Sequence, residues 1–165
     1  MDRSGAKVAR ERPRQEGLAR ARRADEEGRA SGVFQAEAEA TLDYVRRVHR
    51  AGRIASVCTG GMILAASGIL NGAAATTKRE VVPPEKSPLE VMRVSYPQID
   101  VREAMLVDGR GVVTGGGVSL CIDTTLYLLA GMLGQPVADE TARIMEYSRA
   151  WRANREGFAP VFPAK

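Results

Sequence analysis

The sequence lacks the features that mark membrane, secreted and metal-binding proteins. Its longest apolar runs, at residues 62–66 and 126–132, are half or less of the about 18 residues that a membrane span needs. Its charged start holds no apolar segment like that of a signal peptide. Two cysteines are too few for a disulfide framework, and their spacing is not that of a metal site. We therefore expect a cytoplasmic protein with no membrane partner.

The net charge of +4 is not spread over the whole chain. Residues 1–35 hold nine of the 24 basic residues and six of the 20 acidic ones, which leaves residues 36–165 nearly neutral at +1. Residues 1–31 read as a polar, Arg-rich leader that we predict to be disordered, and residues 32–165 as one domain. Because solvated charge runs are common, no nucleic-acid partner is expected.

Apolar patterning in the body predicts alternating helices and strands. Helices are expected at residues 36–50, 62–70, 89–94, 118–133 and 137–151, and strands at 54–57, 74–77, 104–107 and 111–114, the last two forming a hairpin. A loop with three prolines covers residues 78–88. This alternation indicates an α/β fold with a doubly wound sheet.

One turn carries candidate chemistry. Cys58 follows the strand at 54–57 and is followed by Thr59, Gly60 and Gly61 before the next helix. Reaction sites in α/β sheets lie at this end of the strands, and a helix N-terminus favours a thiolate. The amides of Thr59 and Gly60 would then face an anion that forms beside the sulfur. An inert core cysteine is the competing interpretation, but the strand–turn–helix context favours a functional thiol.

Other candidate residues have simpler explanations. Cys121 lies inside an apolar helix and is predicted to be a packing residue, and no disulfide with Cys58 is expected in a reducing compartment. His49, the only histidine, falls late in the helix at 36–50 and reads as a surface residue rather than a base for Cys58. Asp123 is expected to cap a helix or join a hydrogen-bond network, without a catalytic role.

Three consecutive glycines form the second feature of interest. Gly115, Gly116 and Gly117 follow a strand and precede a helix, so their amides could line the same pocket as Cys58. Tight packing between strand and helix is the alternative. Since no Gly-Lys-Ser/Thr follows and the dinucleotide fingerprint is absent, this is not a phosphate-binding loop.

Two blocks resemble a known family. The run Ala55-Ser56-Val57-Cys58-Thr59-Gly60-Gly61, its continuation to Gly72 and then Ala75-Thr76-Thr77 resemble the nucleophile-elbow block of the ThiJ/PfpI family, in the class I glutamine amidotransferase-like superfamily. Residues 106–123 are similar to its strand, glycines and following helix. The resemblance covers about residues 32–150 and implies a flavodoxin-like doubly wound parallel sheet that here lacks its first strands.

The same resemblance implies a function. Cys58-Thr59, in place of a Cys-His pair, looks most like the isonitrile hydratases and the ligand-sensing domains of AraC-type regulators. Cys58 would be the nucleophile that adds water to an isonitrile, a small-molecule substrate, giving an N-substituted formamide. Thr59 would assist it, and Gly60, Gly116, Gly117 and Gly32, a remnant of the family's glycine turn, would bind substrate or oxyanion. Lys78 stands where the family has a histidine.

Two alternatives remain open beside isonitrile hydration. The first is a non-catalytic domain, either one that senses a small molecule or one that has decayed. The second is a glyoxalase-, deglycase- or amidase-like activity. The resemblance also implies a homodimer that needs no metal and no cofactor.

Overall fold

The computed structural model describes residues 39–162, so the predicted leader at 1–31 and Gly32 lie outside the described residues. The helices are α2 (Glu39–Ala51), α3 (Gly60–Ala66), α4 (Pro88–Ser95), α5 (Leu120–Leu133), α6 (Gln135–Ile144) and α7 (Ser148–Gly157). The strands are β1 (Ile54–Ser56), β2 (Ala74–Ala75), β3 (Asp100–Val101), β4 (Leu106–Gly109) and β5 (Val112–Gly115). Helices and strands alternate through much of this region, as the sequence predicts.

The main sheet has the order β1-β5-β4. β1 is parallel to β5, with Ile54 opposite Val112, whereas β4 and β5 form the antiparallel hairpin predicted from the sequence. Arg110 and Gly111 turn this hairpin with φ values of +51° and +77°, the left-handed pair that two-residue hairpin loops favour. Within residues 39–162, β5 is the only strand that pairs with β1.

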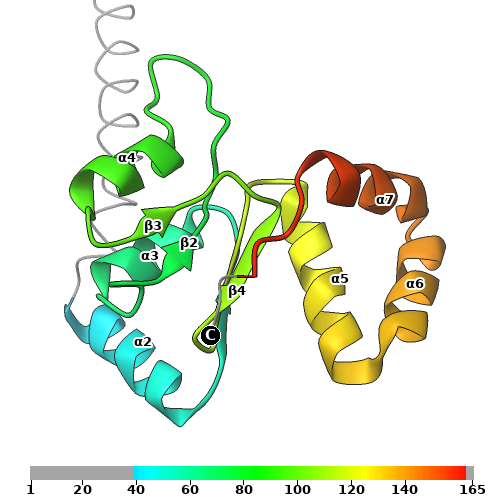
Figure 1. Cartoon of the computed structure of the whole chain (residues 1–165), viewed down its shortest axis with the longest axis horizontal. Helices are drawn as coiled ribbons and strands as arrows, with labels where there is room; N and C mark the ends of the chain where they lie inside the picture. The colour runs from blue at the N-terminus through cyan, green and yellow to red at the C-terminus, as the bar shows by residue number, and fades with distance from the viewer. Residues whose placement is uncertain (1–38, 163–165) are drawn as a thin grey trace, which may run out of the picture.

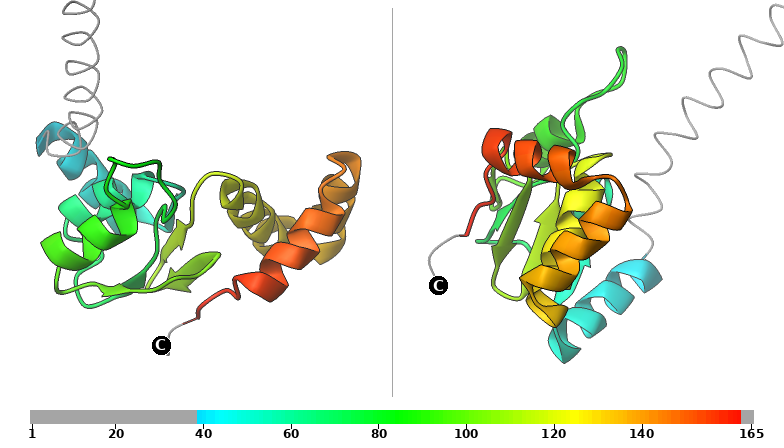
Figure 2. Two further views of the ribbon diagram at one scale, coloured as in Figure 1. Left: turned by 90° about the horizontal axis from the view of Figure 1, so that it is seen from above. Right: turned by 90° about the vertical axis from the view of Figure 1, so that its right-hand side faces the viewer.

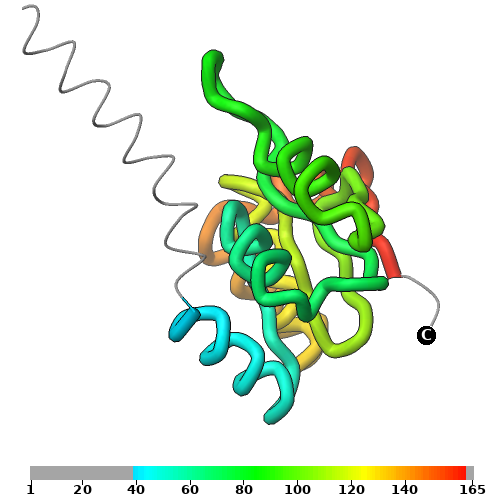
Figure 3. Tube along the Cα trace, turned by 90° about the vertical axis from the view of Figure 1, so that its left-hand side faces the viewer, coloured from blue at the N-terminus to red at the C-terminus, as the bar shows by residue number. Residues whose placement is uncertain are grey.

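Helices flank the sheet on two sides. In Figure 1, α2, α3 and α4 lie on one side of the strands, and α5, α6 and α7 form a separate group on the other. Figure 2 shows the α5–α7 group from two further directions, and Figure 3 shows α2, α3 and α4 in front of the strands. The short strands β2 and β3 pair in parallel beside the main sheet. This β3 pairing was not predicted, since two residues leave no recognisable pattern.

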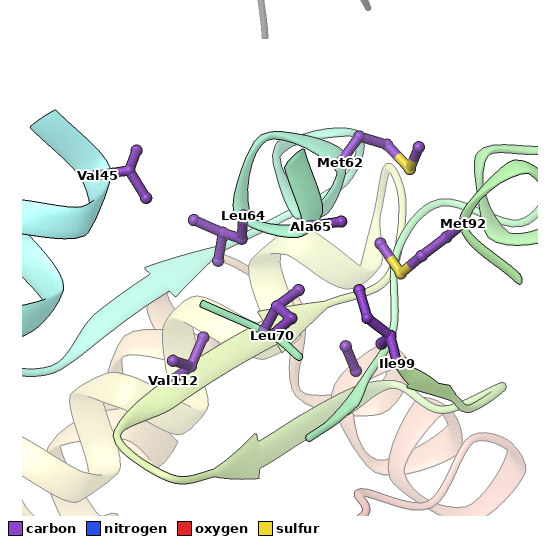
Figure 4. Close-up of a cluster of buried hydrophobic side chains, with 9 residues drawn as sticks. Val45, Met62, Leu64, Ala65, Leu70, Met92, Ile99 and Val112 are labelled. Atoms are coloured by element: carbon purple, nitrogen blue, oxygen red, sulfur yellow. The ribbon is translucent and has the colours of Figure 1, made fainter. Parts of the chain in front are cut away.

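A buried core joins α2, α3 and α4 to the sheet. Figure 4 shows its side chains converging from the helices and strands, among them Val45, Leu64, Leu70, Met92 and Val112. Leu70 and Met92 are almost fully buried, and burial of each such side chain contributes about 1.5–3 kcal/mol. This core fixes α3, and therefore the turn that precedes it, against the end of β1.

The prediction of a single helix at residues 137–151 is wrong, because the helix is interrupted between α6 and α7. Glu146 has φ +56°, and the Tyr147 amide donates to the Ala142 carbonyl at 2.8 Å, a bond that closes α6 and redirects the chain. Of the predicted inner face, Ala138 is buried but Ile144 is 69% exposed.

The break serves the packing of α7. Trp151 on α7 joins Leu126, Ala138 and Ala142 in a second core between α5, α6 and α7. A continuous helix would carry Trp151 past these partners, so tertiary packing here decides against the local helical pattern.

Candidate active site around Cys58

Cys58 lies in a strained turn between β1 and α3. Its φ is +53°, a left-handed conformation that costs an L-residue roughly 1–2 kcal/mol. Two hydrogen bonds hold it from different parts of the chain. The Cys58 amide donates to the Gly116 carbonyl at 3.0 Å, and the Thr77 hydroxyl donates to the Cys58 carbonyl at 2.7 Å. A strained backbone that is fixed from both sides is common at functional sites.

The amides that follow Cys58 are not all free. The Gly60 amide donates to the Val57 carbonyl at 3.0 Å, and the Gly61 amide to the Cys58 carbonyl at 3.4 Å. Within residues 39–162 the Thr59 amide has no hydrogen-bond acceptor. Of the two amides expected to face an anion at the sulfur, Thr59 is therefore the available donor, whereas Gly60 is already paired.

Gly61 lets α3 approach the segment after β2. A Cβ at this position would lie 3.0 Å from the Thr76 carbonyl oxygen and 3.1 Å from the Thr77 side chain. A larger residue would push these groups away. Because Thr77 holds the Cys58 carbonyl, this contact also maintains the turn.

The glycine triplet packs closely and also binds the Cys58 turn. A Cβ on Gly115 would lie 2.9 Å from Thr124 Cβ, and one on Gly117 would lie 2.7 Å from Lys78 Cβ. The Gly116 carbonyl accepts hydrogen bonds from the Cys58 amide and from the Cys121 thiol, the latter at 3.8 Å. Tight packing therefore explains Gly115, while Gly116 takes part in the site.

A pocket of about 290 Å³ opens beside the turn. Thr77, Lys78, Gly116, Gly117 and Asn154 are among its lining residues. Thr77 and Gly116, the two residues that hydrogen-bond to the Cys58 backbone, thus also form part of the pocket wall. Cys58 and Gly60 are not among the residues that line this pocket.

A larger cavity, of about 1030 Å³, lies elsewhere, between the sheet and the α5–α7 group. Ala55, Val113, Tyr127 and Trp151 are among its lining residues, and neither cysteine is. Burial and the neighbouring Asp108 carboxylate raise the pKa of Tyr127 to about 12, so its phenol stays protonated at neutral pH. Because neither cysteine lines this cavity, its larger size does not make it the candidate reaction site.

Cys121 lies at the site, which the sequence did not predict. It is the second residue of α5, is half-buried, and donates to the same Gly116 carbonyl that holds the Cys58 amide. Burial raises the pKa of the Cys121 thiol, and the neighbouring Cys58 raises it further. The apolar sequence around Cys121 hid this role, because only the packing of the glycine loop shows which residue the α5 N-terminus faces.

The other candidates lie apart from the sulfur. His49 lies beside Gly111, at the opposite end of β1 from Cys58, and is half-buried rather than on the surface. Asp123 is fully buried and accepts hydrogen bonds from the Tyr147 hydroxyl and the Asn154 amide, each at 2.9 Å, which confirms its predicted place in a network. Burial raises the pKa of its carboxyl group. Across residues 39–162, no carboxylate or histidine hydrogen-bonds to the Cys58 thiol.

The chain is similar in sequence to known proteins. No protein-family model matches it. It is 32% identical over 118 residues to an isonitrile hydratase from Pseudomonas putida, a match that covers 69% of this chain and 46% of that protein. The chain is therefore a homologue of an isonitrile hydratase.

Another relative of this chain is the HTH-type transcriptional regulator CdhR from Pseudomonas aeruginosa. It is 29% identical over 107 residues, which are 64% of this chain and 30% of the regulator. The chain thus spans less than half the length of either curated relative.

One solved structure agrees with the α/β fold expected from the sequence. A DJ-1 superfamily protein from Salmonella typhimurium, crystallised as a cysteine-to-alanine mutant, matches with a TM-score of 0.51 and 22% identity over 63% of this chain and 52% of its own. A ThiJ/PfpI family protein from Pseudomonas syringae is 30% identical, with a TM-score of 0.47 over 58% of this chain and 36% of its own. The first of these supports the flavodoxin-like fold class.

Two features are absent from the part of the chain that the structure describes. No helix in residues 39–162 is long and apolar enough to cross a membrane. In the same residues, no three His, Cys, Asp or Glu side chains lie close enough together to hold a metal ion.

Proposed function

We propose that this chain supplies the cysteine of an enzyme that hydrates isonitriles to N-substituted formamides. The observation that carries the proposal is the left-handed Cys58 turn, held by Gly116 and Thr77 in a chain related to an isonitrile hydratase. A nucleophile at a sharp strand–helix turn projects from the sheet, where a substrate can reach it. Related sequence and a suitable turn thus support the same residue.

The reaction requires two steps at the sulfur. The Cys58 sulfur bonds to the terminal carbon of the isonitrile, and that carbon gains a proton, which gives a thioimidate, R–N=CH–S–Cys58. Water then adds to this carbon, the C–S bond breaks, and R–NH–CHO leaves with the Cys58 thiol restored. Thr59 has the free backbone donor nearest in sequence to the sulfur, so we assign it to the negative charge that develops as water adds.

Isonitrile turnover tests this proposal. Formamide production, followed by NMR with an alkyl isonitrile, is expected with the wild-type chain and should fall to background in Cys58→Ser. Cys121→Ser is the matched control, because it removes the neighbouring thiol and leaves the nucleophile in place. Formamide production that survives Cys58→Ser at the wild-type rate would rule out Cys58 as the nucleophile.

A ligand-sensing domain is the second candidate function. Sequence similarity to a transcriptional regulator favours a sensing function. The pocket of about 290 Å³, whose wall does not include Cys58, favours it as well. The absence of a carboxylate partner for the thiol within residues 39–162 points the same way. Calorimetric binding of an isonitrile that is never converted would support the sensor over the enzyme.

The homodimer remains a proposal that rests on the family resemblance, and the cytoplasmic location remains one that rests on the amino-acid sequence. Light scattering during size exclusion tests the first, since a dimer should show twice the chain mass of 17.8 kDa. A monomer at micromolar concentration would contradict it.

A further inference from the structure

The two cysteines of this chain meet at one carbonyl group. The Cys58 amide donates to the Gly116 oxygen at 3.0 Å, and the Cys121 thiol donates to the same oxygen at 3.8 Å. Cys58 comes from the turn after β1, whereas Cys121 comes from the first turn of α5. The Gly116 oxygen therefore brings together two residues that are far apart in the sequence.

Both thiols are free, and both are half-buried, so a small oxidant can reach them. Burial raises the pKa of the Cys121 thiol, and the neighbouring Cys58 side chain raises it further. Such an effect requires the two sulfurs to be neighbours. The raised pKa favours the protonated thiol of Cys121, the less nucleophilic form.

We propose that Cys58 and Cys121 form a reversible disulfide when the protein meets a hydroperoxide, and that this disulfide protects and switches off the Cys58 thiol. The inference goes beyond the proposed function, since it needs the two thiols and no isonitrile chemistry. It also differs from a structural disulfide, because the fold forms with both cysteines free.

The chemistry balances with the hydroperoxide as the two-electron oxidant. The Cys58 sulfur attacks the O–O bond, an S–O bond forms, and an alcohol or water leaves. The Cys121 sulfur then attacks the Cys58 sulfenic acid, an S–S bond forms and the S–O bond breaks. The departing hydroxide takes the Cys121 proton and leaves as water. A thiol reductant restores both thiols.

Cys121 would act here as a resolving residue. A sulfenic acid without a nearby thiol is open to further, irreversible oxidation. The Cys121 thiol, which lies at the Gly116 carbonyl, can react with the Cys58 sulfenic acid before this further oxidation occurs.

Mass spectrometry of the full chain tests the proposal. The protein is treated with increasing hydrogen peroxide, free thiols are blocked, and intact masses and peptides are measured with and without reductant. We expect a mass lower by two hydrogen atoms, loss of both titratable thiols, a Cys58–Cys121 peptide pair, and full recovery with reductant. The peptide pair is read in the wild-type chain, so it does not depend on a variant that folds.

Two single variants complete the design. In Cys121→Ser, we expect Cys58 to gain two oxygen atoms that reductant does not remove, whereas in Cys58→Ser, Cys121 should remain a thiol. The proposal is overturned if wild-type Cys58 gains oxygen while Cys121 stays alkylatable, or if the only disulfide joins two chains. Because the readout is mass and thiol count, a failure here is separate from a failure of isonitrile turnover.

Discussion

The left-handed backbone at Cys58 makes an unusual prediction about stability. Glycine normally destabilises a folded chain relative to alanine, by about 0.5–1 kcal/mol, because it loses more freedom on folding. At Cys58 the order should reverse. The φ of +53° costs any residue with a Cβ roughly 1–2 kcal/mol, and glycine escapes this cost. We expect Cys58→Gly to be more stable than Cys58→Ala by about 0.5–1 kcal/mol, which is the difference between these two effects.

Ser56 provides the matched pair. It lies in β1, two residues before Cys58, is also half-buried, and has no positive φ. Ser56→Gly should therefore be less stable than Ser56→Ala by about 0.5–1 kcal/mol. The glycine–alanine difference should change by about 1–2 kcal/mol between the two positions, which equals the left-handed cost itself.

Urea unfolding measures this difference directly. Trp151, the only tryptophan, is 6% exposed in the α5–α7 core and reports unfolding by fluorescence. With an m-value of about 2 kcal/mol/M, the predicted change corresponds to midpoint shifts of about 0.5–1 M. A glycine penalty at Cys58 as large as that at Ser56 would refute the idea that this turn stores strain.

Two further predictions concern the surroundings of the site. Gly115→Ala should destabilise the fold by about 1–3 kcal/mol, because the new Cβ would overlap the buried Thr124 side chain. Gly131→Ala in α5, where a Cβ would have no atom within 4 Å, should stabilise the fold by about 0.5–1 kcal/mol. Equal urea midpoints for the two variants would contradict this packing argument. Burial raises the pKa of the Asp123 carboxyl group in the folded state, so the unfolded chain loses this proton at a lower pH than the folded chain does. The free energy of unfolding of the wild type should therefore fall as the pH rises from about 4 through the pKa of Asp123 in the folded state. Asp123→Asn has no proton to lose, so its stability relative to wild type should increase over that range when unfolding is measured from pH 4 to pH 7; a difference that stays constant with pH would argue against this assignment.

The local sequence was a good guide to the elements around Cys58. The β-branched run at 54–57 and the small residues Gly60 and Gly61 predicted a strand–turn–helix, and the structure has β1 and α3 there. The predicted hairpin was also correct, although Asp108 and Gly109 belong to β4 and the turn falls at Arg110-Gly111. In each case neighbouring residues set the backbone conformation, so a short window held the information.

Sequence reasoning failed where distant residues compete with local pattern. The helix expected at 137–151 divides at Glu146, because Trp151 gains more from packing against Leu126 and Ala138 than from continuing α6. No window of α6 contains those partners. The same limit applies to Asp123, whose partners Tyr147 and Asn154 come from the region after that break.

The sequence by itself determined that Cys58 follows a strand, precedes a helix and has no histidine beside it in the chain. Only the tertiary structure decided which residues surround Cys58. The Gly116 carbonyl accepts hydrogen bonds from the Cys58 amide and the Cys121 thiol because the glycine triplet lets β5 and α5 pack closely, and Thr77 holds the Cys58 carbonyl from the other side. Backbone conformation depends mainly on near neighbours, whereas a site is assembled by the burial of surfaces that the chain brings together only when it folds.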